Sequence, residues 1–451
     1  MLKTYEILVV FISFILIVKS IRRLIWMSKS IYFIHLLFCF IFVLPIILDY
    51  LIGYPTYNTK YYGFILSYND TATRFIYATY VLLSQLIMLL IGNIRINKKG
   101  KIYLLVDSKK AINKVKELSS TTDLDYNTKN YNRYVDFLLL FASIITVLLV
   151  LIFPISKEIL WTYDWRNKGI IIEGQKYYFT IERLSYISII SGIIYILGKK
   201  RSIITKIIIP LFIFMTICTQ GKRSILFFMI LAIISYLFIN VKLSKRKWIF
   251  ILAIISAVGI VSYSIYIKVF YRGYSGFDSL YTTLRIDFFR DDTTKLVIYS
   301  LLNPNSIKIL DYPGQSIITQ IGALFPLQFL DVPVIGYNTY LTSALIGASY
   351  KYSAQNWMTT SIFDEMLANF SFFGFWIAPM VLGIFSKIAD KQNCKIKPIT
   401  ISSLILLMMY SPSYILWYMQ FWFIITLAEK VAKNKNIQLF NENDLYNRGL
   451  L

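Results

Sequence analysis

Long apolar segments separated by short basic stretches are the feature that most constrains this chain. A membrane-spanning helix needs about 20 mostly apolar residues, and the sequence offers about eleven such segments, two of them short and near the C-terminus. Hydrophobic residues make up 57% of the chain and charged residues only 16%, so water would not solvate it as several ordinary globular domains. The sequence therefore predicts an all-α polytopic integral membrane protein.

Basic residues between the apolar segments set the predicted orientation, because cytoplasmic loops of membrane proteins are enriched in Lys and Arg. Arg22 and Arg23 follow the first segment, Ile7 to Val18, which has no cleavage site behind it and is expected to remain as a span. The N-terminus is therefore predicted outside and the C-terminus inside. The predicted regions are a transmembrane bundle at 1–267 with a basic cytoplasmic loop at 95–134, a large outer loop at 268–360, C-terminal spans at 361–430 and a cytoplasmic tail at 431–451. Within 95–134 we expect a short surface helix and a linker.

The net charge of +23 does not indicate a nucleic-acid partner. Most of the 47 lysines and arginines fall in the predicted cytoplasmic segments, where they signal orientation. Three scattered cysteines, Cys39, Cys218 and Cys394, give neither a disulfide framework nor a metal spacing. The single histidine, His35, excludes a site built from several His ligands. We expect no metal and no cofactor.

Basic residues on the predicted outer face are more informative than those inside, because orientation does not explain them. Lys222 and Arg223 lie in a short outer turn, where they predict an anion site: a guanidinium offers paired donors to phosphate oxygens. The alternative is that both side chains reach toward lipid head groups. Arg272 follows closely on a span and is expected at the membrane interface, where a pyrophosphate head group would also lie.

The large outer loop carries further candidates. Arg285 and Arg290 are reserve anion ligands, although each could pair with nearby acids on a solvated surface. Ile317 to Leu330 is apolar enough to form a helix at the interface, as a lid or floor. Trp357 could stack on a sugar, with packing in an interfacial aromatic belt as the alternative.

Ser361, Glu365 and Asn369 repeat at four-residue spacing, which on a helix places three polar side chains on one stripe. A carboxylate at the mouth of an apolar span is costly unless it faces the bundle interior or a wet cavity. The competing interpretation is an N-terminal cap, since acids are favoured in the first helical turn, and it suits Asp364 more than Glu365.

At these residues the chain resembles the Wzy-type oligosaccharide repeat-unit polymerases. The family shows a pattern like Ser-x-x-x-Glu-x-x-x-Asn-Phe-x-x-x-Gly entering a span. Members often carry Gly directly after the Asn-Phe pair, where this chain has Ser371. The residues that match are Ser361, Glu365, Asn369, Phe370 and Gly374.

The resemblance implies a GT-C-like glycosyltransferase architecture and an enzyme of O-antigen or capsule synthesis in the bacterial cytoplasmic (inner) membrane. Such an enzyme passes a glycan from an undecaprenyl pyrophosphate carrier to a hydroxyl of another lipid-linked repeat unit at the outer face. The expected partners are the lipid-linked donor and acceptor, membrane lipids and a chain-length regulator protein.

The residues suit that chemistry. Pyrophosphate is a good leaving group, so fixed positive charge helps most, and Arg223 and Arg272 are expected to supply it. The incoming hydroxyl needs a base, and without an available His a carboxylate must serve, for which we expect Glu365. The predicted substrate-binding residues are Lys222, Arg285, Arg290, Ser361, Asn369 and Trp357.

Two other functions are compatible with this pattern. A ligase of the same architecture would pass the glycan to another acceptor, but by resemblance such ligases rely on an outer-face histidine, and none is predicted outside here. A flippase or other transporter usually needs ionisable residues deep within its spans. Here the spans hold such residues only near their ends: His35, Asp49, Asp136 and Lys206.

Overall fold

The computed structural model describes about half of the chain. The described residues are 2–27, 29–55, 57, 61–96, 102–104, 288–324, 336–347, 358–392 and 397–410, with the isolated helical residues 140, 141, 144, 148, 188, 192, 281 and 285. The chain divides into two compact units, Met1–Tyr103 with Ile234–Ile415 and Leu104–Ile233 with Leu416–Leu451. The first unit holds nearly all described residues and every element described below.

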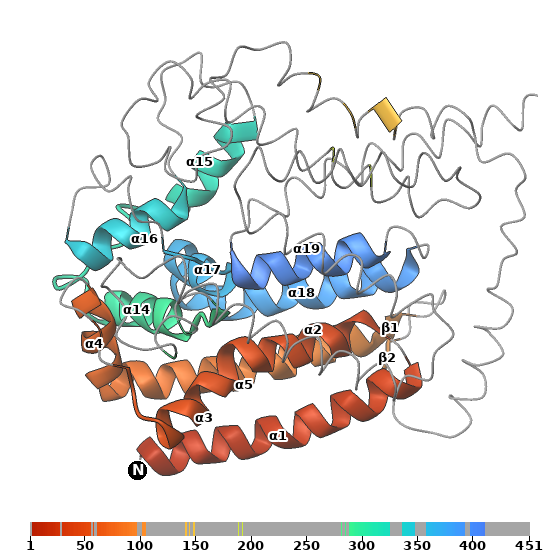
Figure 1. Ribbon diagram of the computed structural model, residues 1–451, viewed down its shortest axis with the longest axis horizontal. Coiled ribbons are helices and arrows are strands. Elements are labelled where there is room, and N and C mark those ends of the chain that lie inside the picture. The colour runs from red at the N-terminus through yellow and green to blue at the C-terminus, as the bar shows by residue number, and fades with distance from the viewer. Residues whose placement is uncertain are drawn as a thin grey trace, which may run out of the picture. The chain divides into compact units, whose positions relative to one another are not determined.

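The N-terminal part is helical and follows the apolar segments of the sequence (Figure 1). The predicted spans Ile31–Ile52 and Phe75–Ile94 are confirmed as helices, the first of them interrupted by a π-helical turn ahead of Pro45, which lacks a backbone N–H to donate. The elements are α1 (Leu2–Met27), α2 (Ser30–Phe38), η1 (Cys39–Val43), α3 (Leu44–Leu51), α4 (Tyr62–Asn69) and α5 (Thr71–Asn93).

The start of the predicted cytoplasmic loop forms a pair of short strands, β1 (Ile94–Ile96) and β2 (Ile102–Leu104). The surface helix predicted within 95–134 is not found in these residues, and the rest of the loop lies outside the described residues. Both strands contain residues that favour strands, Ile94 and Ile96 in the first and Ile102 and Tyr103 in the second. In the sequence Gly100, a residue common in turns, lies between them.

The C-terminal half of the unit contains helices within the predicted outer loop as well as beyond it. The first part of the apolar helix predicted at Ile317–Leu330 is confirmed by α15, which begins two residues earlier; residues 325–330 lie outside the described residues. The elements are α14 (Asp291–Leu302), α15 (Gln315–Leu324), α16 (Tyr337–Ile346), α17 (Ile362–Phe370), the 3-10 turn η5 (Ser371–Phe373), α18 (Gly374–Lys391) and α19 (Lys397–Met409).

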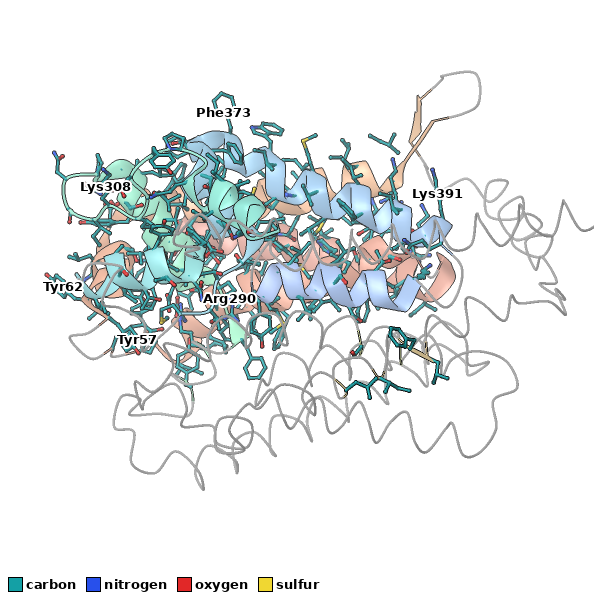
Figure 2. All side chains as sticks on the ribbon, turned by 90° about the horizontal axis from the view of Figure 1, so that it is seen from above. Tyr57, Tyr62, Arg290, Lys308, Phe373 and Lys391 are labelled. Atoms are coloured by element: carbon teal, nitrogen blue, oxygen red, sulfur yellow. The ribbon has the colours of Figure 1, made fainter. Side chains whose placement is uncertain are left out.

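Three of the described helical segments are long and apolar enough to cross a membrane: Ser30–Leu51, Thr71–Asn93 and Ile362–Lys391. The described part of the chain is thus mainly α-helical with three candidate spans, as expected for a membrane protein. Figure 2 shows Tyr57 and Tyr62 at one end of these helices and Lys391 at the other. A chain whose successive helices cross a membrane in opposite directions requires such a separation.

Helix α5 is the centre of this unit and packs against α1, α2, α4, α14 and α18. Asp70 caps it by accepting a hydrogen bond from the backbone N–H of Thr73 at 3.0 Å. Phe363 fixes α17 to the same core, because its ring lies 5.1 Å from that of Phe38 and 4.9 Å from that of Phe42. The α17 helix is therefore held on one side by aromatic packing, which leaves its polar residues to meet other elements.

Candidate functional site

Helix α17 begins with a capping box. The Ser361 backbone N–H donates to Asp364 Oδ1 at 2.6 Å, and the two side chains are also hydrogen-bonded. Ser361 is thus the N-cap residue and precedes the first turn. The cap interpretation is confirmed for Asp364, and the polar stripe on the helix itself consists of Glu365 and Asn369.

The Glu365 side chain is completely buried and contacts α15. Its Oε1 accepts hydrogen bonds from Ser316 Oγ at 2.8 Å and from Gln320 Nε2 at 2.6 Å. Among the described residues, no group donates to its Oε2. The carboxylate therefore has one oxygen engaged by α15 and one without a donor among the described residues.

Asn369 binds the beginning of α15 with both its side chain and its backbone. Its Nδ2 donates to Ser316 Oγ at 2.7 Å, its Oδ1 accepts from the Ser316 N–H at 3.2 Å, and its carbonyl accepts from the Gly314 N–H at 3.1 Å. The Ser316 hydroxyl therefore donates a hydrogen bond to Glu365 and accepts one from Asn369. A carboxylate and an amide, one helical turn apart, hold a single hydroxyl between them.

Directly after this pair the chain breaks before α18, and the break has two steric requirements. Ser371 has φ 54° and ψ −140°, a conformation that favours glycine. A Cβ on Gly374 would lie 2.4 Å from the carbonyl oxygen of Met366, so a side chain there would force the backbone to move. The turn therefore suits glycine at both positions, although serine occupies the first.

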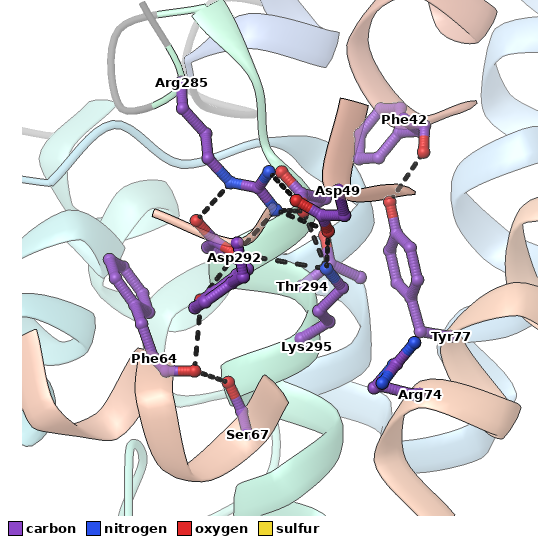
Figure 3. A network of polar contacts seen from close by, with 12 residues as sticks. Phe42, Asp49, Phe64, Ser67, Arg74, Tyr77, Arg285, Asp292, Thr294 and Lys295 are labelled. Carbon is purple, nitrogen blue, oxygen red and sulfur yellow. Dashed lines mark hydrogen bonds and ion pairs between the residues drawn. The ribbon is translucent and has the colours of Figure 1, made fainter. Parts of the chain in front are cut away.

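A second polar centre joins α14 to the end of α3 (Figure 3). Arg285 donates to Asp292 at 2.9 Å and is also paired with Asp49 and Asp291. Lys295 lies 2.8 Å from Asp291 and 3.7 Å from Asp49. These five residues, called the ion cluster below, are almost completely buried.

Tyrosines surround the ion cluster. The Arg285 guanidinium lies 5.0 Å from the ring centre of Tyr54, and the Lys295 ammonium lies 5.1 Å from that of Tyr77. The Tyr57 hydroxyl donates to Asp292. Burial raises the pKa of Asp291 to about 6, although the positive charge of Arg285 acts in the opposite direction. For Asp292 the same burial is outweighed by the charges of Arg285 and Lys295, which lower its pKa.

Both reserve arginines donate to groups of the protein. Arg285 uses all five of its N–H donors on the three carboxylates and Tyr281. Arg290 is completely buried and donates to the carbonyl oxygens of Met409 at 2.7 Å and Phe289 at 2.5 Å. The expected pairing of Arg285 with nearby acids is found, but in the interior and not on a solvated surface.

The structure brings together Glu365 and Asn369, places Ser361 beside them as a cap, and keeps Arg285 in a separate ion cluster. Sequence reasoning missed Ser316 and Gln320, although their four-residue spacing repeats that of the pair they contact. It also gave Asp49 no partner. The predicted residues Lys222, Arg223, Arg272 and Trp357 lie outside the described residues.

Within the described ranges, no group of three or more His, Cys, Asp or Glu side chains is arranged to hold a metal ion. Comparisons of the chain with protein-family models, with curated proteins and with solved structures find no match.

Proposed function

We propose that this chain is a membrane glycosyltransferase that polymerises oligosaccharide repeat units carried on undecaprenyl pyrophosphate. The reaction breaks the bond between the donor sugar and its pyrophosphate and forms a glycosidic bond to a hydroxyl of the acceptor. The hydroxyl proton passes to a base, and the lipid pyrophosphate leaves. Its setting is the outer face of a bacterial cytoplasmic membrane.

The observation that carries the proposal is the hydroxyl held by Glu365 and Asn369. A carboxylate that accepts from a hydroxyl while an amide donates to it is the arrangement needed to orient and deprotonate an attacking sugar hydroxyl. Both residues belong to the segment that resembles the polymerases. In the proposed reaction Glu365 is the base and Asn369 positions the acceptor.

The backbone between α17 and α18 supports the resemblance independently. Family members often have Gly at the position of Ser371, and the positive φ there favours glycine. Gly374 matches the family pattern, and the close approach of Met366 leaves no room for a Cβ. The pattern therefore agrees with the geometry at residues that perform no chemistry.

The positive charge for the leaving pyrophosphate is assigned to Arg223 and Arg272, with Lys222 beside the first. Arg285 is not assigned this role because its donors serve the ion cluster and Tyr281. Arg290 is not assigned it either, since its guanidinium is buried and donates to the carbonyl oxygens of Met409 and Phe289. Binding energy for the donor would come from paired N–H donors to phosphate oxygens.

The test measures the distribution of surface-glycan chain lengths, seen as a ladder of bands, in a deletion strain complemented with variants of the protein. Glu365→Gln keeps the shape and the contact with Ser316 but removes the base, so we expect a loss of about 10²–10⁴ in rate and a collapse of the ladder to single repeat units. Asp311→Asn is the control, because Asp311 is an exposed carboxylate in the predicted outer loop. A full ladder with membrane-inserted Glu365→Gln would refute the proposal, and loss of all surface glycan in the deletion strain would favour a flippase.

Arg223→Lys and Arg272→Lys test the anion site. Lysine keeps the charge and loses the paired geometry, so both variants should shorten the ladder. Unchanged chain lengths in both would remove these arginines from the mechanism.

A further inference from the structure

We infer that α15 is a displaceable occupant of the acceptor site. The Ser316 hydroxyl stands where the attacking sugar hydroxyl binds, and α15 leaves Glu365 and Asn369 when a glycan enters. The identity of the incoming ligand rests on the function proposed above, whereas the displacement of α15 does not.

Hydrogen-bond geometry makes Ser316 a stand-in for a sugar hydroxyl. Its Oγ lies 2.8 Å from Glu365 Oε1 and 2.7 Å from Asn369 Nδ2. A secondary alcohol of a sugar has the same single O–H donor and the same acceptor lone pairs. Both ligands need the same two protein groups, so they exclude each other.

Within the described residues, the side-chain hydrogen bonds that attach α15 to α17 are made by Ser316 and Gln320. Among the described elements α15 packs chiefly against α17. Gln320 adds a third side-chain hydrogen bond, at 2.6 Å to Glu365. Ile318, on the opposite side of the helix, is 59% exposed. Each such hydrogen bond contributes about 0.5–1.5 kcal/mol, or up to 3 to a charged partner, and a polar ligand that offers equivalent bonds recovers that free energy.

The chain before α15 can accommodate the movement. Gly314 has φ 79°, which only glycine adopts without strain, and it directly precedes the helix. Tyr312 and Pro313 before it are exposed. Rotation at this position would carry Ser316 and Gln320 away together.

Glu365 retains a second oxygen for the ligand. Its Oε2 is buried and no described group donates to it. A buried carboxylate oxygen without a donor is costly, and a further sugar hydroxyl would satisfy it. Ser316 and Gln320 both bind Oε1 and leave Oε2 without a donor among the described residues. A glycan in place of α15 could bind both oxygens of Glu365.

The experiment measures thiol labelling of α15 in membrane vesicles with a membrane-impermeant maleimide. Ser316→Cys reports displacement, because position 316 is completely buried when α15 is in place. Ile318→Cys is the matched control on the same helix, since position 318 is exposed in either state. The parent chain supplies the background from its native cysteines.

The added probe is undecaprenyl-pyrophosphate oligosaccharide extracted from the deletion strain. We expect it to accelerate labelling of Ser316→Cys about tenfold, the change that about 1.4 kcal/mol produces, and to leave Ile318→Cys unchanged. Gln320→Ala in the Ser316→Cys background should raise the basal labelling rate about fivefold without the probe, because one hydrogen bond is lost.

The outcomes separate this inference from the proposed function. If labelling of Ser316→Cys stays slow with and without the probe while the cells still form polymer, α15 is a fixed element and the inference is wrong. If the probe accelerates labelling but Glu365→Gln still makes full-length polymer, the glycan displaces α15 and the proposed chemistry fails.

Discussion

Helices α14 and α15 belong to the same predicted outer loop but are attached to the bundle in opposite ways. The α14 helix is buried along most of its length, with Leu296, Val297 and Ile298 in the core and the ion cluster at its start. The α15 helix depends on hydrogen bonds to one acid and one amide. Separating α14 from the bundle would expose apolar surface and leave buried charges unpaired. Separating α15 from α17 would only exchange its hydrogen bonds for those of a polar ligand. A loop of this kind has a fixed part and an exchangeable part.

The largest expected effect is on the fixed part. Arg285→Met leaves three carboxylates without their main cation, and breaking a buried ion pair by removing one partner costs about 3–5 kcal/mol. We expect a correspondingly large fall in the thermal unfolding temperature of the detergent-purified protein. Lys308→Met is the control: its pair with Asp311 is exposed, and such pairs contribute about 0–1 kcal/mol. Equal stability of the two variants would contradict the structural role of the ion cluster.

The second prediction concerns pH. The pKa of Asp291 is about 6 in the folded protein because of burial, against an ordinary value near 3.8. Between these values the folded protein binds a proton that the unfolded chain does not, so lowering the pH from 7 to 5 should stabilise the fold through this group. The slope is at most about 1.4 kcal/mol per pH unit.

Asp291→Asn has no carboxyl to titrate, so the difference between the two stability profiles isolates the effect. Parallel profiles from pH 7 to pH 5 would show that Asp291 binds no extra proton on folding.

A smaller, local effect is expected for the exchangeable part. Asn369→Ala removes the two side-chain hydrogen bonds to Ser316, which together contribute about 1–2 kcal/mol. Hydrogen exchange should become faster in α15 but not in α14, while the unfolding temperature changes little. Equal acceleration in both helices would mean that they open as one body.

The smallest expected change is an increase in the stability of the folded protein. Ser371→Gly relieves a positive φ, and we expect stabilisation by about 1 kcal/mol. This substitution lies in the break beside Asn369 but changes no contact of either α14 or α15. The rates of hydrogen exchange in α14 and α15 should therefore stay unchanged. Faster exchange in α15 alone would show that the strained backbone at Ser371 helps to hold this helix.

The apolar helices could be predicted from the sequence because burial in lipid or in a bundle imposes long uninterrupted apolar runs. The predicted span Phe75–Ile94 and the observed α5 differ by four residues at the start and one at the end. The partners of polar residues could not be predicted in this way. Asp49 meets Arg285 across 236 positions, and Ser316 meets Glu365 across 49, and no local pattern encodes such contacts.

Ser361 shows the limit of spacing arguments. Four-residue spacing places side chains on one face only if all of them are inside the helix, and Ser361 lies just before it. Its hydroxyl therefore contacts Asp364 and not Glu365. The spacing was right for the pair inside the helix and wrong for the residue at its edge.

The break between α17 and α18 has a consequence for depth in the bilayer. The 18 residues of α18 rise about 27 Å, close to the roughly 30 Å of a hydrocarbon layer, so α18 is long enough to supply most of the candidate span Ile362–Lys391. Exposed aromatic rings at the break suit the boundary between hydrocarbon and head groups: Phe370, Phe372, Phe373 and Trp376. Figure 2 shows Phe373 projecting from this end of the helices. The proposed reaction requires the Glu365–Asn369 pair to lie near the level of the head groups. A glycan anchored by its lipid would reach it by lateral diffusion.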